Sequence, residues 1–200
     1  MYEVEVKVPA ELERVRDRLD EIDAERIETV EQVDTYYDAP HRPFADTDEA
    51  LRIRRERRTA DDAVSCDVTY KGPLLEEASK TRIELETAVG DREAMHAILE
   101  HLGFDPTAAV VKRRERYEVD GYAVTLDEVT DVGEFVEVER EVEQSGGERA
   151  EGEGERGDRP ENAGIDEARE GAYAVLEKLE LDPWDQIRTS YLELLLEDDS

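Results

Sequence analysis

The opening run MYEVEVKV alternates charged with apolar side chains, and the charges are Glu3, Glu5 and Lys7. Successive side chains of a β-strand face opposite ways, so the run predicts a strand with two carboxylates and one ammonium on one face. For a single strand, exposure to solvent would be the ordinary role of such a face. Turned inward, the carboxylates could bind a divalent cation and the ammonium could bind phosphate.

Further alternating segments carry mainly cations where the opening run carries acids. Within each segment the charged side chains share one face. They are Arg52 with Arg54, Lys71 with Thr69, Arg82 with Glu84, Lys112 with Arg114, Asp127 with Thr125, and Glu137 with Glu139. The pattern returns too often for solvation alone to explain it. We therefore expect these faces to line the polar interior of a barrel.

A polyphosphate is the anion that such an interior would suit. Arginine offers a planar fork of donors and lysine a compact charge, while Mg²⁺ or Mn²⁺ binds carboxylate oxygens together with phosphate. The candidate phosphate cradle is Arg52, Arg54, Lys71, Arg82, Lys112 and Arg114. The candidate metal ligands are Glu3, Glu5, Glu137 and Glu139. The residues thus predict a metal-dependent binder of a triphosphate-like anion.

Hydrophobic periodicity places these side chains on roughly eight strands with helices between them. Besides the opening run, the predicted strands are 25–38, around 51–54, 64–71, 81–89, 110–119, 122–129 and 133–142, and the predicted helices are 10–22, 91–102, 165–181 and 185–197. The strand at 25–38 alternates only loosely, through Ile27, Val30, Val33 and Tyr36. Asp120-Gly121 is a strong hairpin signal. The fold class is α+β, with a barrel covered on its outside by helices.

The composition of the chain bounds its partners. The chain has 200 residues, suited to a single domain at 1–200, and a formal net charge of -30 that would repel nucleic acid and anionic membranes. Arginine far outnumbers lysine among the few cations, a composition typical of salt-loving organisms, where ionic strength screens the self-repulsion. Residues 144–164 are rich in Gly, Glu and Arg and predict a flexible insertion.

One cysteine and the lack of a leader sequence or long apolar run indicate the compartment. Cys66 has no partner for an internal disulfide, which fits a reducing cytosol. Met1 leads directly into the first predicted strand, and no apolar run approaches membrane-spanning length. We expect a soluble, cytoplasmic protein.

These segments together resemble the CYTH superfamily, the triphosphate tunnel metalloenzymes. Its ExExK signature alone would be a weak match, but the ordered set covers nearly the whole chain. The matching segments are Glu3 to Lys7 (EVEVK), Gln32 to Asp38 (QVDTYYD), Phe44 to Arg54 (FADTDEALRIR), Thr69 to Pro73 (TYKGP), Arg82 to Glu84 (RIE), Lys112 to Arg114 (KRR), Leu126-Asp127, and Gly133 to Glu139 (GEFVEVE). The tail from Ser190 to Leu195 (SYLELL) is similar to that of the class IV adenylate cyclase branch.

The resemblance implies a fold and a set of residue roles. The fold is an eight-stranded antiparallel tunnel. The implied metal ligands, for Mg²⁺ or Mn²⁺, are Glu3, Glu5, Glu137 and Glu139. The implied phosphate ligands are Lys7, Arg52, Arg54, Lys71, Arg82, Lys112 and Arg114, with Glu84 supporting them. Catalytic roles fall to Lys7, Asp127 and Arg114, with Asp127 helping to position the metal or the attacking group.

The resemblance leaves three reactions open. A class IV cyclase converts ATP to cyclic AMP and pyrophosphate, and FADTDEALRIR favours this branch. Cyclases of that branch carry a His-Phe pair shortly before ExExK, where this sequence has only Met1 and Tyr2. A triphosphatase acting on inorganic triphosphate, thiamine triphosphate or a nucleotide is therefore the alternative enzyme. A module that binds a triphosphate without turnover is the third possibility. Related tunnel proteins can form dimers, so the resemblance also implies a possible homodimer.

From the sequence, we expect the substitution Arg54→Ala or Glu5→Gln to abolish turnover and leave the fold largely intact. Both side chains lie on predicted charged strand faces rather than among the apolar residues that would form a core.

Overall fold

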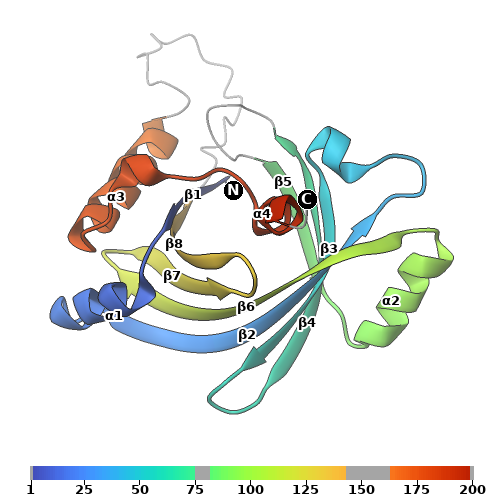
Figure 1. Ribbon diagram of the computed structural model, residues 1–200, viewed down its shortest axis with the longest axis horizontal. Coiled ribbons are helices and arrows are strands. Elements are labelled where there is room, and N and C mark those ends of the chain that lie inside the picture. Colours follow the sequence, from blue (N-terminus) through green and yellow to red (C-terminus); the bar gives the residue numbers. More distant parts are fainter. Residues whose placement is uncertain (1, 75–81, 143–162, 199–200) are drawn as a thin grey trace, which may run out of the picture.

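A computed structural model of the chain describes residues 2–74, 82–142 and 163–198, and Figure 1 shows a strongly curled sheet with helices around it. The strands are β1 (Tyr2–Pro9), β2 (Glu25–Asp38), β3 (Ala50–Arg58), β4 (Val64–Leu74), β5 (Arg82–Ala88), β6 (Asp105–Val119), β7 (Tyr122–Val129) and β8 (Gly133–Val142). The α-helices are α1 (Leu12–Glu21), α2 (Arg92–His101), α3 (Ala163–Lys178) and α4 (Tyr191–Asp198), with short 3-10 turns η1 (Phe44–Thr47) and η2 (Pro183–Asp185).

The eight strands form one antiparallel sheet, which confirms the predicted α+β fold. Their order is β1-β8-β7-β6-β2-β3-β4-β5, and every neighbouring pair is antiparallel. Within the described residues β1 and β5 are the two edges and do not pair with each other. The sheet is therefore a half-barrel rather than a closed barrel over this part of the chain.

The predicted hairpin between β6 and β7 is confirmed. Asp120 and Gly121 have φ values of 53° and 77°, so both central residues adopt the left-handed conformation of a type I′ turn. The turn sets Arg114 opposite Asp127 across the two strands. A local feature of the sequence thus fixes the pairing of a cation with a carboxylate that lie far from the turn.

Three helices cover the convex face of the sheet, as predicted. Leu12 and Leu19 of α1 and Leu176 of α3 are fully buried, and they join one core with Val6 of β1 and Val138 of β8. On the other side of the molecule, α2 buries Leu99 against Tyr37 and Ile53. These apolar side chains occupy the strand positions between the charged ones, so the charged positions are left to the concave face.

The last helix differs from the prediction in both its start and its place. It begins at Tyr191 rather than near residue 185, because residues 183–185 form the turn η2 and the chain is extended after it. It also lies within the curl of the sheet instead of outside it (Figure 1). There Tyr191 packs with Val110 and Phe135, which share a strand face with Lys112 and Glu137.

The predicted insertion at 144–164 lies almost entirely outside the described residues. In the part that is described, no helix is both long and apolar enough to cross a membrane.

Candidate functional site

The charged residues singled out in the sequence meet on the concave side of the sheet, which we call the lumen face. Side chains at alternate positions of β1 to β4 and β6 to β8 contact one another there. In sheet order the lumen face carries Lys7, Glu137, Asp127, Thr125, Arg114, Lys112, Gln32, Asp34, Arg54, Arg52, Glu56 and Lys71. Most of them are buried or nearly so, which is unusual for charged side chains unless they are paired.

Arg114 holds two buried carboxylates at the centre of β6, β7 and β8. Its Nε donates to Asp127 Oδ1 at 2.6 Å, and its Nη2 contacts the carboxylates of both Asp127 and Glu137. Burial alone would raise the pKa of Glu137, but the charges of Arg114 and Lys7 outweigh it and hold that pKa well below its usual value. Both carboxylates are therefore anions at neutral pH.

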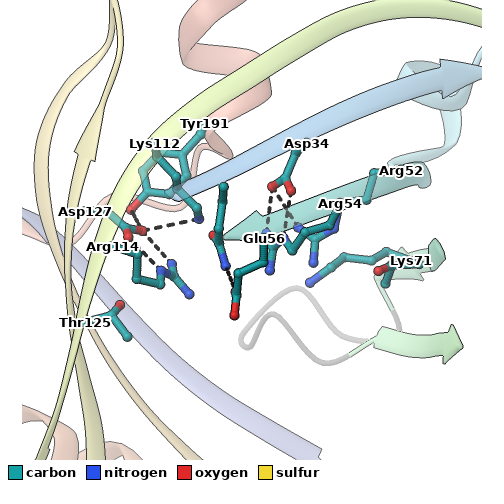
Figure 2. Close-up of polar contacts among 12 residues, drawn as sticks. Asp34, Arg52, Arg54, Glu56, Lys71, Lys112, Arg114, Thr125, Asp127 and Tyr191 are labelled. Atoms are coloured by element: carbon teal, nitrogen blue, oxygen red, sulfur yellow. Dashed lines mark hydrogen bonds and ion pairs between the residues drawn. The ribbon is translucent and has the colours of Figure 1, made fainter. Parts of the chain in front are cut away.

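Tyr191 brings the C-terminal helix into the same cluster, as Figure 2 shows. Its hydroxyl donates to Asp127 Oδ2 at 2.9 Å. Its ring lies 4.0 Å from Lys7 Nζ and 4.9 Å from Lys112 Nζ, measured to the ring centroid, so one aromatic ring stabilises two ammonium groups. Lys7 Nζ also lies 3.4 Å from Glu137, and Lys112 Nζ lies 3.4 Å from Asp127.

A second cluster forms around Asp34 on β2 and β3. Arg54 binds both carboxylate oxygens of Asp34, through Nε at 2.7 Å and Nη2 at 2.6 Å. Arg52 is held much more weakly, by one contact of 3.5 Å, and its buried Nε has no partner among the described residues. Arg54 therefore stabilises the fold through Asp34. Arg52 keeps one buried donor, Nε, that no acceptor of the described chain satisfies.

A polar bridge lies between the two clusters. Gln32 Nε2 donates to Glu56 Oε2 at 2.5 Å, and Arg116 Nη2 binds the same carboxylate at 2.8 Å. Gln32 stands opposite Lys112 on β6 and opposite Glu56 on β3. Gln32 is also fully buried.

The remaining predicted residues lie nearer the edges of the sheet. Lys71 on β4 pairs with Glu84 on β5 at 2.8 Å, and each side chain is about one-third exposed (30% and 31%). This pair is consistent with the supporting role expected of Glu84. The side chains of Glu3 and Arg82 lie outside the described part of the structure, so their predicted roles stay predictions.

The carboxylates expected to bind metal lie on β1 and β8. Glu5 is directly opposite Glu139, and Lys7 directly opposite Glu137. Carboxylates in such a pair stand about 4.5–5.5 Å apart at Cβ, where two like charges repel unless a cation lies between them. Within the described residues no group of three or more acidic, His or Cys side chains is arranged to hold a metal.

A Glu5 and Glu139 pair nevertheless fits Mg²⁺, which typically uses one or two protein carboxylates and completes its shell with water and substrate phosphate. Glu137 fits less well as it stands, because Arg114 and Lys7 already bind it. The structure therefore distinguishes Glu137, which Lys7 and Arg114 bind closely, from Glu5 and Glu139, which face each other with Lys7 Nζ at 4.0 Å from Glu5.

Sequence reasoning missed three residues of the lumen face and one beside it. It assigned no role to Gln32, Asp34 or Glu56, and it gave the tail around Tyr191 only a place on the outside of the barrel. The signal for the first two was the alternation of Gln32, Asp34 and Tyr36, which places their side chains on one face of β2. No local pattern could have shown that Tyr191 reaches Asp127, because 64 positions separate them.

If the lumen face binds phosphate as predicted, the buried ammonium of Lys112 should make that affinity depend on pH. Burial and the charge of Arg114 lower its pKa to about 8, despite Asp127 and Glu137 nearby. Bound phosphate favours the charged form, so we expect affinity for inorganic triphosphate to fall as pH rises above 8, by up to about tenfold per unit. Titrations between about pH 7 and pH 9.5 would measure this loss.

Lys112→Arg is the matched control, because arginine stays charged throughout this range. An equally steep loss of affinity in this variant would assign the titration to another group. The same pKa shift predicts that the free energy of unfolding of the free protein rises between about pH 8 and 10.5, since there the unfolded chain binds a proton that the folded chain has released.

Comparison with known proteins places these features in a family. Residues 1–150 match the CYTH domain family. A protein of Methanocaldococcus jannaschii named "Putative adenylate cyclase MJ0240" is 32% identical over 195 residues, covering 97% of this chain and 98% of that protein.

Two solved structures are similar over nearly their whole length. The PH1819 protein of Pyrococcus horikoshii is 37% identical with a TM-score of 0.82, covering 98% of this chain and 99% of its own. A conserved hypothetical protein of Pyrococcus furiosus is 26% identical with a TM-score of 0.73, covering 96% and 99%.

Proposed function

The chain belongs to the CYTH domain family, and from this premise we propose that it is a divalent-metal-dependent enzyme that converts ATP to cyclic AMP and pyrophosphate on the lumen face. One observation supports a polyphosphate substrate above all others. In a chain of net charge -30, cations gather on a single sheet face. They are Lys7, Arg52, Arg54, Lys71, Lys112 and Arg114. Such a cluster suits an anion with several charges.

The reaction needs little covalent chemistry from the protein. The ribose 3′-hydroxyl oxygen attacks the α-phosphorus, the bond from that phosphorus to the bridging oxygen breaks, pyrophosphate leaves with its electron pair, and the hydroxyl proton passes to the leaving pyrophosphate or to water. The protein contributes by positioning groups and by stabilising the charge that develops on phosphate oxygens. A divalent cation at Glu5 and Glu139 would add Lewis-acid stabilisation of those oxygens.

The lumen-face residues divide this work. Arg52 has a buried donor without a described partner, so it binds phosphate oxygen directly. Lys7 and Lys112, held against the Tyr191 ring, supply two further charges. Asp127 accepts hydrogen bonds from Arg114 and Tyr191, so it acts by orienting cations rather than as a free base.

Hydrolysis of a triphosphate is the second candidate, and a specific observation favours it. The contacts of the lumen face are mostly between cations and carboxylates. The cations would bind the phosphates of any triphosphate and would not select for a nucleoside. In this reaction water attacks the terminal phosphorus and orthophosphate is released. The same cations serve both reactions, so the product must decide.

The test is a product assay with ATP, inorganic triphosphate and thiamine triphosphate in parallel, with Mg²⁺ or Mn²⁺, in low salt and in high potassium chloride. We expect cyclic AMP and pyrophosphate from ATP. Orthophosphate from any of the three substrates, without cyclic AMP, would replace the cyclase with a triphosphatase. Binding without any product would leave only a binding module.

Glu5→Gln tests the metal assignment separately. Removing one charge of the Glu5 and Glu139 pair is expected to raise the metal concentration for half-maximal activity by about tenfold or more, so that the loss of turnover expected from the sequence is seen at metal concentrations sufficient for the wild-type protein. The melting temperature without metal should change little, because the substitution removes both a 4.0 Å ion pair with Lys7 and the like charge opposite Glu139. Glu128→Gln, at an exposed position of β7, is the control and should leave the metal requirement unchanged. An equal metal requirement in Glu5→Gln and Glu128→Gln would show that Glu5 is not a metal ligand.

A further inference from the structure

Gln32 is an unusual member of the lumen face because it is neutral and only half satisfied. Its side chain is fully buried, and Nε2 donates to Glu56, which fixes that end of the amide as the nitrogen. The other end, Oε1, has no hydrogen-bond partner within the described residues. A buried acceptor left unpaired costs free energy comparable to a lost hydrogen bond, so this atom indicates a missing donor.

The neighbours of Gln32 do not provide that donor. The ammonium of Lys112, directly across the sheet, lies against Asp127 and the ring of Tyr191. Arg54 directs Nε and Nη2 at Asp34 rather than at Gln32. Beside the two cation clusters, the described residues therefore leave one buried acceptor, Gln32 Oε1, and one buried donor, Arg52 Nε, without a partner, and a ligand bound there would supply both.

These two orphan atoms demand different groups of the ligand. Arg52 Nε requires an acceptor, which any phosphate oxygen provides. Gln32 Oε1 requires an O–H or N–H donor, and ionised inorganic triphosphate has none. An organic triphosphate has donors on its organic part. Of these, the ribose hydroxyls lie nearest to the phosphates, whereas the amino group of the base lies farther away.

We propose that Gln32 is a specificity-determining residue whose side-chain carbonyl accepts a hydrogen bond from a ribose hydroxyl, so that the site prefers a ribonucleoside triphosphate over inorganic triphosphate. The inference rests on the proposed function and deepens it, because the cation clusters explain phosphate binding and Gln32 explains the nucleoside. The amide orients the hydroxyl and takes no proton from it.

The test measures dissociation constants by calorimetry with the full-length protein, for ATP, 2′-deoxy-ATP, 3′-deoxy-ATP and inorganic triphosphate. For the wild-type protein we expect one deoxy analogue to bind about tenfold or more weakly than ATP. The hydroxyl that this analogue lacks is the donor to Gln32 Oε1, which is then left unpaired. For Gln32→Leu we expect the affinity for ATP to fall by a similar factor. The affinity for inorganic triphosphate should change less than about threefold. That deoxy analogue should then lose no further affinity in the variant, because both changes remove one hydrogen bond.

Each other outcome overturns the inference. Equal weakening of ATP and inorganic triphosphate in Gln32→Leu would indicate that the donor is water or a hydrated metal ion. No weakening of either would mean that ordered water satisfies Oε1. Equal binding of all three nucleotides by the wild-type protein would refute a ribose contact without any variant, even if Gln32→Leu does not fold. Binding of no triphosphate at all would instead refute the proposed function itself.

Glu31→Gln is the matched control on the same strand. Glu31 is the sequence neighbour of Gln32, is 51% exposed and binds Arg57 on the convex side, so this change leaves the Gln32 amide and its bond to Glu56 in place. The ratio of ATP to inorganic triphosphate affinity should stay within about threefold of the wild-type ratio. A change of that ratio as large as the change in Gln32→Leu would assign the effect to strand β2 rather than to the carbonyl of Gln32.

Discussion

Replacing Arg114 with alanine is expected to destabilise the protein by about 3–5 kcal/mol and to abolish turnover. Arg114 is the shared partner of Asp127 and Glu137, and all three side chains are buried. Without the guanidinium, two anions would face each other in a region that water reaches poorly. Lys7 and Lys112 would remain, each at 3.4 Å from one carboxylate, and would compensate only in part.

Chemical denaturation of Arg114→Ala beside the wild-type protein measures the first effect, and the product assay measures the second. Arg113→Ala is the matched control, since Arg113 is adjacent in β6, 42% exposed, and bound to Glu115 on the convex side. That carboxylate keeps Arg16 and Arg26, so we expect a loss below about 1 kcal/mol. Equal stability of the two variants would show that Arg114 does not neutralise the buried carboxylates.

The faces of β6, β7 and β8 were predictable from the sequence. Charged and apolar residues alternate clearly along most of β7 and β8, and the Asp120-Gly121 turn fixes the register between β6 and β7. Lys112, Arg114 and Asp127 were therefore placed on the correct face before any coordinates. Two consecutive short connections leave these three strands few other ways to pair.

The face of β2 was not predictable in the same way. Val30 and Tyr36 lie on the lumen face and Val33 on the other, so apolar side chains occur on both sides of the strand. Its pairing with β6 also contains two register shifts. A mixed pattern of this kind hides Gln32 and Asp34, because no single face is apolar from end to end.

The sequence also could not predict which cations bind carboxylates in the folded chain. Asp34 and Arg54 are 20 residues apart, and their contact depends on the pairing of β2 with β3. The sequence treats Arg52 and Arg54 as equivalent members of a phosphate cradle. The structure separates them, because Asp34 binds Arg54 through two oxygens and Arg52 only at 3.5 Å.

That separation leads to opposite expectations for two neighbouring substitutions. Arg54→Ala leaves the buried carboxylate of Asp34 without its main partner, so we expect a loss of stability of about 3 kcal/mol or more together with the loss of turnover. This differs from the sequence-based expectation that the fold would be largely intact. Arg52→Ala removes only the weaker contact, so we expect at least about a hundredfold loss of turnover with a change below about 1 kcal/mol in stability.

The pH dependence of unfolding distinguishes this explanation from a general loss of packing. Burial would raise the pKa of Asp34, but Arg54 outweighs it and holds the pKa far below the ordinary 3.8, so Asp34 stabilises the fold above that pH and loses this contribution as pH falls. Arg54→Ala should therefore weaken the acid dependence of unfolding, whereas Arg52→Ala should largely keep it.

Arg57→Ala, on the same strand and facing Glu31 and Asp62, is the control for both and should change neither turnover nor acid dependence. If Arg52→Ala and Arg54→Ala instead lost stability and acid dependence equally, the two guanidinium groups would share Asp34, and neither could be reserved for phosphate.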